Sequence, residues 1–310
     1  MSRRGSALTR VFAAWLTIAY LRITRIFPLS ISRTFTVLIG RIAYYIVPRI
    51  RKVGLANLDL AYGDSMSRAE KIRILKGSVH NLALVSAEFS RIPDLAAGKL
   101  THLFTVEGLE QLDRAQPLFF IGAHLGNWEW IAPAMSIQGF RVAEIIRKLD
   151  NPALNRCVDA LRSSSGVRTV PKTGAARTVN ALIKKGWAVG LLVDQSPRKN
   201  ALPVTFFGKP CWASSAPAII AARAHAKVHV ITMIRQDDGR YCICFHPALD
   251  FVKTDNFRAD LQENTQRCQD VLESIVRQHP EQWLWFHRRW KARPKLEKLW
   301  KDRHDRQQSS

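Results

Sequence analysis

The stretch PLFFIGAHLGNWEW, residues 117–130, changes from an apolar run to a short turn that carries a histidine and a glutamate. The apolar run is typical of a buried β-strand, and the glycine and asparagine that follow are typical of a turn. We expect a helix next, with Asn127 as its N-cap and Glu129 in its first turn. The sequence therefore predicts a strand–turn–helix unit with His124 at the carboxyl end of the strand.

Short apolar runs alternate with helical patterns along the rest of the chain. Strands are expected within PLFFIG (117–122), WAVGLLVD (187–194), PVTFF (203–207), KVHVITMI (227–234) and YCICF (241–245). Helices are expected within NPALNRCVDALRSS (151–164), GAARTVNALIKK (174–185) and APAIIAARAHA (216–226), and a long amphipathic helix is expected from Ser67. This alternation predicts an α/β fold, a mixed, mostly parallel sheet flanked by helices on both faces.

Length and composition indicate a folded globular chain. It has 310 residues, of which 47% are hydrophobic, so it can bury a sizeable core. Because we find no internal repeat and no low-complexity linker, the economical division is a basic helical arm (1–58), one catalytic domain (59–294) and a polar basic tail (295–310). The net charge of +22 predicts attraction to an anionic partner: nucleic acid, an anionic lipid surface, a phosphorylated substrate or an acidic carrier protein.

The arm has no acidic residue before Asp59. Its basic residues include Arg3, Arg4, Arg10, Arg22, Arg25, Arg33, Arg41, Arg49, Arg51 and Lys52. The apolar run VFAAWLTIAYL (11–21) is about half as long as a helix that spans a bilayer, and the arginines that follow would be costly inside one. We therefore favour a monotopic, membrane-dipping arm over a single-pass span, and a helical hairpin packed on the domain is the alternative. A secretory signal peptide is disfavoured because no small-residue cleavage site follows.

The cysteines suggest neither a disulfide framework nor a zinc ribbon. They are Cys157, Cys211, Cys242, Cys244 and Cys268, an odd set without CxxC spacing, which fits a reducing compartment. On a strand, Cys242, Cys244 and His246 would share one face, as metal ligands or as small core residues, and we favour the core. His225 and His229 lack the glutamate of an HExxH motif between them. We expect no metal.

The spacing of His124 and Glu129 raises a question of chemistry. Residues five apart on one helix are separated by about 140°, so only a turn brings these two side chains into one crevice. There the carboxylate would hold one imidazole nitrogen and leave the other as a base. No GxSxG motif supplies a protein nucleophile, so the nucleophile would be a substrate hydroxyl that attacks an activated acyl group. The alternative is a core histidine beside a surface glutamate.

Four blocks of the sequence resemble one family in the expected order. AHLGNWEW (123–130), LLVDQ (191–195), VTFFGKP (204–210) and EQWLWFHRRWKARP (281–294) are similar to the bacterial lipid A biosynthesis acyltransferases, the lauroyl and myristoyl transferases of the glycerolipid and lysophospholipid acyltransferase superfamily. The resemblance covers about residues 10 to 294. It implies a glycerol-3-phosphate acyltransferase-like fold and a membrane-associated enzyme at the cytoplasmic face of the bacterial inner membrane. Such an enzyme moves a fatty acyl chain from acyl carrier protein to a hydroxyl of a glycolipid.

The resemblance also implies roles for individual residues. In the family's HX4D/E motif, His124 would be the general base and Glu129 its partner. Arg147 would contact substrate phosphate, unless it is a solvated arginine at a strand end. The substrate-binding set would be completed by Asn127 beside the pair, by Asp194 and Gln195 in the pocket wall or acceptor site, and by Phe207 and Gly208 at an apolar pocket mouth. The tryptophans and arginines of residues 283–293 would have a structural or membrane-proximal role.

The resemblance implies no cofactor, with acyl-[acyl carrier protein] or acyl-CoA as co-substrate. The expected partners are acyl carrier protein, an anionic glycolipid or phospholipid acceptor and the membrane surface. A lysophospholipid, an ornithine lipid or a glycosylated phosphatidylinositol is the alternative acceptor, because the histidine motif is shared across the superfamily. A nucleic-acid-binding protein is the alternative of another class, supported by charge alone, since the sequence has no zinc-finger, RNP or helix-turn-helix signature.

Overall fold

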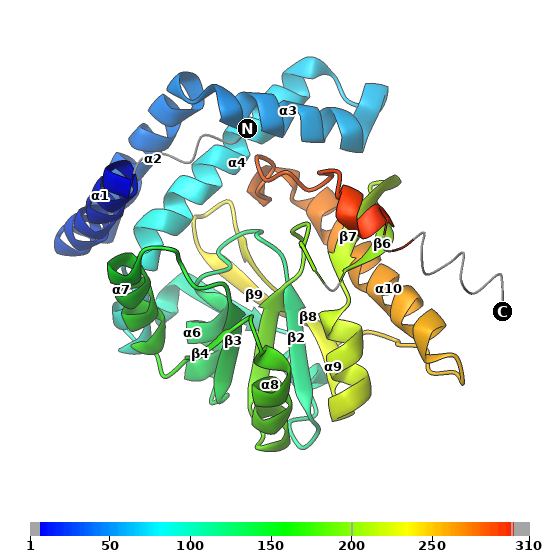
Figure 1. The fold of residues 1–310 in the computed structure, drawn as a ribbon. Helices are drawn as coiled ribbons and strands as arrows, with labels where there is room; N and C mark the ends of the chain where they lie inside the picture. The colour runs from blue at the N-terminus through cyan, green and yellow to red at the C-terminus, as the bar shows by residue number, and fades with distance from the viewer. Residues whose placement is uncertain (1–6, 200, 299, 301–310) are drawn as a thin grey trace.

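A seven-stranded sheet forms the centre of the molecule (Figure 1). The structure, a computed structural model, describes residues 7–199, 201–298 and 300, so Arg3, Arg4 and most of the predicted tail lie outside the described residues. The strands, in spatial order, are β1 (Phe104–Glu107), β9 (Tyr241–Ala248), β8 (Lys227–Arg235), β2 (Leu118–Gly122), β5 (Ala188–Leu192), β3 (Val142–Ile146) and β4 (Arg168–Pro171). Neighbouring strands are parallel except β8 and β9, which confirms the predicted mixed, mostly parallel sheet.

Helices cover both faces of the sheet, because the central strands are apolar on both sides. One core lies between the sheet and α8 (Ala175–Lys184), α9 (Ala216–Ala224) and α10 (Phe257–Gln278). The other lies between the sheet and α5 (Ile92–Ala96), α6 (Ile131–Ile137) and α7 (Pro152–Ser163). Short 3-10 turns are found at Gly63–Ser65, Thr101–Leu103, Leu109–Gln111 and Pro280–Gln282.

Two local predictions need correction. The run PVTFF contributes to β6 (Ala201–Phe206), which pairs only with β7 (Lys209–Ser214) in a separate antiparallel hairpin. Its loop, Phe207 and Gly208, has positive φ at both positions, as a tight hairpin turn requires. In addition, Glu129 precedes α6 rather than entering it, because Asn127 caps a turn by accepting a hydrogen bond from the Trp130 N–H at 3.2 Å.

The predicted long helix is α4 (Arg68–Phe89), which lies between the sheet and the N-terminal helices (Figure 1). Ser67 and Glu70 form a reciprocal capping box at its start, which satisfies backbone donors that the first turn leaves free. Buried side chains in the first half of α4 belong to the first core, and the side chain at its C-terminal end belongs to the second. This helix therefore joins the two layers.

The N-terminal arm consists of α1 (Ala7–Ile26), α2 (Leu29–Ile46) and α3 (Pro48–Tyr62), so the boundary expected after residue 58 falls within α3. Helix α2 packs along α4, and Gly40 allows a close approach because a Cβ there would lie 3.0 Å from the Ala83 Cβ. The arm leaves many large apolar side chains exposed, here called the apolar arm surface: Val11, Phe12, Trp15, Leu16, Ile23, Ile26, Phe27, Ile31, Phe35, Leu38, Ile39, Ile42, Tyr45 and Ile46. Among the described residues, no helix combines the length and hydropathy needed to cross a bilayer.

Candidate active site

His124 and Asp194 meet at the carboxyl edge of the sheet. The register of β2 and β5 pairs Gly122 with Leu192, and each of the two side chains follows two residues later at the same level. Their hydrogen bond joins His124 Nδ1 to Asp194 Oδ1 at 2.8 Å, and the His124 backbone N–H donates to Asp194 Oδ2 at 2.9 Å. Carboxyl ends of parallel strands are where open α/β sheets bind ligands, so this edge is the candidate site.

Asp194 is buried and is held from a third direction. The Trp283 indole N–H donates to its Oδ2 at 2.9 Å. Burial alone would raise the pKa of Asp194, but the charge and hydrogen bonds of His124, with the Trp283 bond, lower it well below its usual range. Burial alone would lower the pKa of His124, but the charge and hydrogen bond of Asp194 outweigh it and raise that pKa. The two groups therefore form a pair that favours the imidazolium.

The second ring nitrogen of His124 faces Gln195. The Gln195 Nε2 atom lies 3.2 Å from His124 Nε2. The same amide nitrogen lies 3.4 Å from His124 Nδ1, so it is close to both ring nitrogens. When the ring is neutral with its proton on Nδ1, Nε2 is the nitrogen free to accept a proton. The structure thus brings Asp194 and Gln195, both predicted from the sequence, into direct contact with His124.

Glu129 has a different partner from the one that the sequence predicted. It lies in the same turn as His124, but its described hydrogen bonds come from the Trp128 indole and from Arg162, whose Nη2 is 2.8 Å from Glu129 Oε1. The prediction that Glu129 holds an imidazole nitrogen is therefore wrong, because Asp194 takes that place. Its charge still acts on the ring, since Glu129 contributes to the raised pKa of His124.

Arg162, which the sequence analysis did not single out, joins Glu129 to a second carboxyl group. It lies in α7 with its side chain 20% exposed, and its Nε is 3.9 Å from Glu144 Oε2. Burial raises the pKa of Glu144 to about 7, with Arg162 opposing and Glu129 adding to the shift. The Glu144 carboxyl group near Arg162 is therefore partly protonated at neutral pH.

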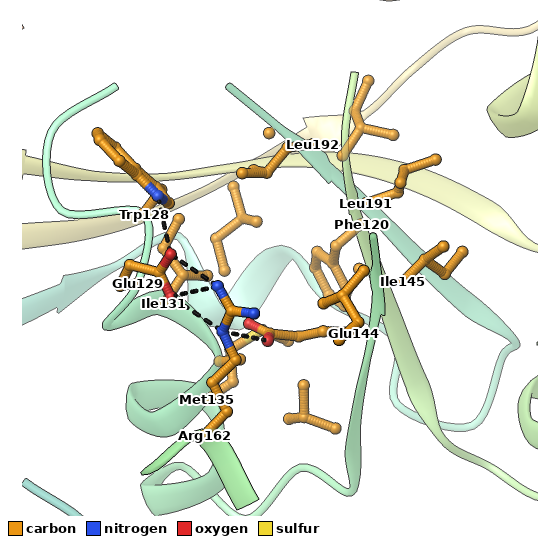
Figure 2. Close-up of a pocket in the computed structure, with 17 residues that line it drawn as sticks. Phe120, Trp128, Glu129, Ile131, Met135, Glu144, Ile145, Arg162, Leu191 and Leu192 are labelled. Atoms are coloured by element: carbon orange, nitrogen blue, oxygen red, sulfur yellow. Dashed lines mark hydrogen bonds and ion pairs between the residues drawn. The ribbon is translucent and has the colours of Figure 1, made fainter. Parts of the chain in front are cut away.

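These polar groups border an apolar cavity on the side of the sheet that faces α6 (Figure 2). Its volume is about 90 Å³, and its walls come from β2, β3, β5, α6 and the turn. Trp128 and Glu129 are among its lining residues, and the Trp128 ring lies 5.3 Å from the His124 ring between centroids. The imidazole is not a lining residue, but it contacts a residue that lines this apolar space.

The remaining predicted site residues lie elsewhere or have other contacts. Arg147 follows β3 with its side chain 69% exposed, and it pairs with Asp150. Phe207 is 3% exposed within a cluster of aromatic rings, so the predicted pocket mouth is wrong for Phe207, which packs in the core, while Gly208 completes the hairpin turn. Asn127 is a fully buried residue of the turn, and its side chain donates to Glu88.

The aromatic C-terminal block supports the site from behind. Trp283 and Trp285 are buried, and Leu125 forms a β-bridge with Trp283. Arg289 is fully buried and donates to the Trp212 carbonyl at 2.7 Å. These buried contacts are structural, which is one of the two roles, structural or membrane-proximal, that the family resemblance implies for this block.

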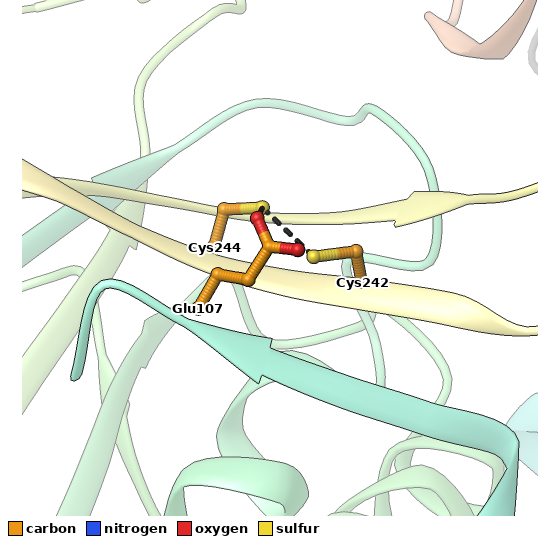
Figure 3. Close-up of side chains that lie close together, drawn as sticks. All are labelled: Glu107, Cys242 and Cys244. Atoms are coloured by element: carbon orange, nitrogen blue, oxygen red, sulfur yellow. Dashed lines mark hydrogen bonds between the residues drawn. The ribbon is translucent and has the colours of Figure 1, made fainter.

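A separate cluster of potential metal ligands lies at the edge of the sheet (Figure 3). Sulfur and oxygen atoms of Glu107, Cys242 and Cys244 all lie within 4.8 Å of one another, whereas His246, predicted on the same face, bonds to Thr232 at 3.2 Å. Burial, the neighbouring thiol and Glu107 raise the pKa of Cys244 to about 12, so without a metal it is a thiol at neutral pH. His225 caps α9 and His229 contacts the His246 carbonyl, so these two do not form a shared site.

Comparisons with known proteins agree on one family. The sequence profile described as bacterial lipid A biosynthesis acyltransferase matches residues 3–292. The chain is similar to the lipid A biosynthesis palmitoleoyltransferase of Escherichia coli K12, with 26% identity over 83% of each chain. It is also similar to the lipid A biosynthesis lauroyltransferase of that organism, with 22% identity over 92% of this chain and 93% of the relative. The solved 1-acyl-sn-glycerophosphate acyltransferase PlsC from Thermotoga maritima aligns with 79% of this chain and 98% of its own, at a TM-score of 0.34 and 16% identity.

Proposed function

Because the chain belongs to the bacterial lipid A biosynthesis acyltransferase family, we propose that it transfers a fatty acyl chain from acyl-[acyl carrier protein] to a hydroxyl of a lipid A precursor. The observation that carries the mechanism is the His124–Asp194 pair beside an apolar cavity. The reaction is a secondary acylation in lipopolysaccharide biosynthesis, without a metal and without a cofactor other than the acyl donor. An acidic carrier and a phosphorylated glycolipid both suit a protein of net charge +22.

His124 acts as the general base in this proposal. Asp194 holds the Nδ1 proton, so Nε2 takes the proton of the acceptor hydroxyl once that hydroxyl displaces the Gln195 amide. The acceptor oxygen then forms a bond to the thioester carbonyl carbon. The carbon–sulfur bond breaks, and the thiol of the carrier leaves with the proton from the imidazolium. The acyl group passes directly between substrates and no acyl-enzyme forms.

The apolar cavity holds part of the acyl chain in this proposal. Its volume of about 90 Å³ corresponds to about three water molecules, so it takes only a segment of the chain unless neighbouring side chains move. Glu129 holds Arg162 in the wall of the cavity. There the guanidinium either stabilises the negative charge that develops on the carbonyl oxygen or attracts the acceptor phosphate. Arg147, exposed after β3, is a second candidate for phosphate contact.

The arm binds the cytoplasmic face of the bacterial inner membrane as a monotopic element in this proposal. Exposed apolar side chains of α1 and α2 alternate with arginines, a combination that suits an interface with anionic lipids. The acceptor would thus reach the active site from the bilayer to which the arm is bound.

A transfer assay with the protein in detergent tests the proposal. The donors are acyl-[acyl carrier protein] and acyl-CoA, and mass spectrometry detects the product on a lipid A precursor. We expect His124→Ala to lower the rate by about 10²–10⁴-fold with an unchanged melting temperature. His102→Ala, which changes an exposed histidine of a 3-10 turn, is the control. Full activity of His124→Ala, or a stable fatty ester on a protein side chain during turnover, would refute the mechanism.

The same assay separates the alternative acceptors. A lysophospholipid, an ornithine lipid and a glycosylated phosphatidylinositol are offered in place of the lipid A precursor. If one of them is acylated in a His124-dependent reaction while the lipid A precursor is not, the mechanism holds and the proposed acceptor is wrong. Lipid A from cells with and without the protein then shows which secondary acyl chain is missing.

A further inference from the structure

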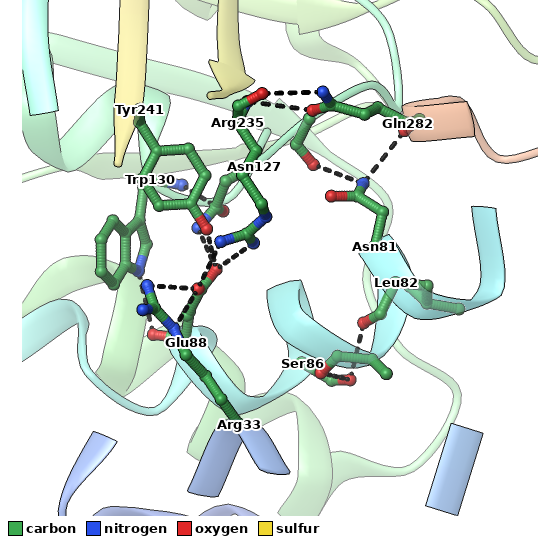
Figure 4. Close-up of polar contacts among 12 residues, drawn as sticks. Arg33, Asn81, Leu82, Ser86, Glu88, Asn127, Trp130, Arg235, Tyr241 and Gln282 are labelled. Atoms are coloured by element: carbon green, nitrogen blue, oxygen red, sulfur yellow. Dashed lines mark hydrogen bonds and ion pairs between the residues drawn. The ribbon is translucent and has the colours of Figure 1, made fainter. Parts of the chain in front are cut away.

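Glu88, in the last turn of α4, is a fully buried carboxylate outside the active site (Figure 4). Arg33 Nε donates to its Oε1 at 2.7 Å, and Arg235 Nη2 donates to its Oε2 at 3.0 Å. The Tyr241 hydroxyl also donates to Oε2, as does Asn127 Nδ2 at 2.8 Å. Four residues therefore donate to one carboxylate, from α2, from the neighbouring strands β8 and β9, and from the turn that follows β2.

The number of donors indicates that the position of this carboxylate is tightly determined. A buried anion is retained only when it is paired and its oxygens are hydrogen-bonded, and Glu88 meets both conditions. Two arginines pair with one glutamate. Loss of the glutamate charge would therefore leave two largely buried guanidinium groups without their anion. The network is therefore rigid with all members present and sensitive to the loss of one.

On one side, Glu88 holds the turn that carries His124 and Glu129. The Asn127 side chain donates from Nδ2 to the Glu88 carboxylate. Its Oδ1 atom accepts a hydrogen bond from the Trp130 backbone N–H. The Trp130 indole donates to the Glu88 backbone carbonyl at 2.9 Å. The turn thus contacts Glu88 at two points that flank Glu129.

On the other side, Glu88 holds the arm. Arg33 belongs to α2, and its side chain is 22% exposed and reaches inward to the carboxylate. Its helix also carries Phe35, Leu38 and Ile39 of the apolar arm surface. One carboxylate therefore fixes both the helix that we place at the membrane and the turn that we place at the reaction.

We propose that Glu88 is a positioning residue that couples the seating of α2 to the geometry of the turn bearing His124 and Glu129. This inference rests on the proposed function for its catalytic consequence. When α2 is displaced, Arg33 leaves the carboxylate, the network loses one cation and the Asn127 link loosens. Turnover then falls because the reacting groups are misplaced, while the affinity for the donor changes little.

Variants at the two ends of the link test the coupling. Arg33→Ala is expected to lower kcat by about 10-fold or more and to change the donor KM by less than about twofold. Arg33→Lys, which keeps one charge, is expected to recover part of the loss. Arg25→Ala removes an equal charge from an exposed position of α1, so it serves as the reference for any loss of membrane attraction, and the kcat of Arg33→Ala is compared with it. A kcat of Arg33→Ala equal to that of Arg25→Ala would overturn the proposal.

A double-mutant cycle separates coupling from independent damage. Because Arg33 and Asn127 act through the same carboxylate, the combined Arg33→Ala and Asn127→Ala changes should cost less than the product of their single effects. Effects that multiply would mean that the two contacts are independent and that Glu88 does not connect them. These variants decide the question even if Glu88→Gln fails to fold.

Hydrogen exchange of residues 123–130 provides a readout that needs no activity. Arg33→Ala should speed exchange in this turn by about 10-fold relative to Arg25→Ala, with unchanged exchange in β2. Unchanged exchange in the turn would overturn the coupling even in an active enzyme. Faster exchange in a protein that acylates none of the offered acceptors would support the coupling and refute only the proposed function.

Discussion

Asp194 determines how His124 acts, because it is the carboxylate that contacts the imidazole. Burial by itself disfavours the imidazolium, and the charge and hydrogen bond of Asp194 reverse that effect. A raised pKa makes the ring a stronger base and also raises the pH below which the base is already protonated. Asp194 therefore orients the ring, and in the proposed mechanism it also sets the acidic limb of the pH–rate profile.

We expect Asp194→Asn to lower the maximal rate by about 10²–10⁴-fold. The acidic limb of the pH–rate profile should also move to lower pH, because burial then acts on His124 without the opposing carboxylate and lowers its pKa. Rates measured from pH 5 to 9 test both effects. Asp150→Asn, a change of the same shape at a side chain 84% exposed, should leave the profile unchanged. An acidic limb that stays in place would show that Asp194 does not set the pKa of His124.

The sequence predicted the position of the proposed base, His124, but not the carboxylate that contacts it. His124 follows an apolar run, and its place at a strand end could be predicted from that local pattern. Asp194 lies 70 residues further on, and its contact with His124 depends on β2 and β5 being neighbours, which no local pattern specifies. Arg162 was missed because it occupies an ordinary position near the end of an amphipathic helix. Glu129 was misassigned because proximity in sequence was taken for contact.

Strand β5 shapes the apolar cavity through a residue without a side chain. Gly190 lines the cavity, and its partner in the register of β5 and β3 is Glu144, which also lines it. A Cβ on Gly190 would have no heavy atom within 4 Å. The space that the missing side chain leaves is therefore part of the volume that we assign to the acyl chain.

We expect Gly190→Val to shift donor preference towards shorter acyl chains, because its methyl groups would occupy that space. The kcat/KM for the preferred donor should fall by about 10-fold or more, since one methylene group in a tight pocket is worth about 1–3 kcal/mol. Competition among donors of different chain length measures the shift. Gly190→Ala, whose Cβ fits the open space, is the matched control and should have a smaller effect. An unchanged donor preference in Gly190→Val would place the acyl chain outside this cavity.

Elements with strong apolar runs could be predicted, and short or polar ones could not. The runs at 117–122, 187–194, 227–234 and 241–245 form β2, β5, β8 and β9. Edge strands β1 and β4 span only four residues each, too few for an alternation to be recognised. The run at 203–207 has strand composition, but whether it joins the central sheet depends on the chain around it.

At the scale of the whole molecule, the arm has its polarity reversed relative to an ordinary surface helix. The buried side of α2 carries Ser32 and Thr36, whereas Phe35, Leu38 and Ile39 face outward. Small polar residues at a helix contact with large apolar residues outside are typical of helices that meet lipid. The arm packs on the domain, as the hairpin alternative predicted, and it also presents the apolar surface that a membrane-dipping arm requires. The two hypotheses are therefore compatible.

If the arm binds the membrane as proposed, the apolar arm surface makes the contact with lipid. Phe12, Trp15 and Leu16 lie on one face of α1 and are 65%, 59% and 54% exposed. Replacing all three by serine should weaken binding to vesicles of phosphatidylethanolamine and phosphatidylglycerol by about 10²-fold, at roughly 1 kcal/mol for each partly buried side chain. The melting temperature should not fall, because these side chains make little contact with the core.

Phe257→Ser, at a side chain 53% exposed on α10, is the matched control and should bind vesicles as the unchanged protein does. Added salt should weaken the residual binding of the triple variant more than that of the unchanged protein, because only the attraction between the arginines of the arm and the anionic lipid is left. Sedimentation with vesicles at two salt concentrations measures both quantities. If the triple variant binds as tightly as the unchanged protein, α1 does not enter the bilayer interface, and the acceptor must reach His124 by a route that does not depend on this face of the arm.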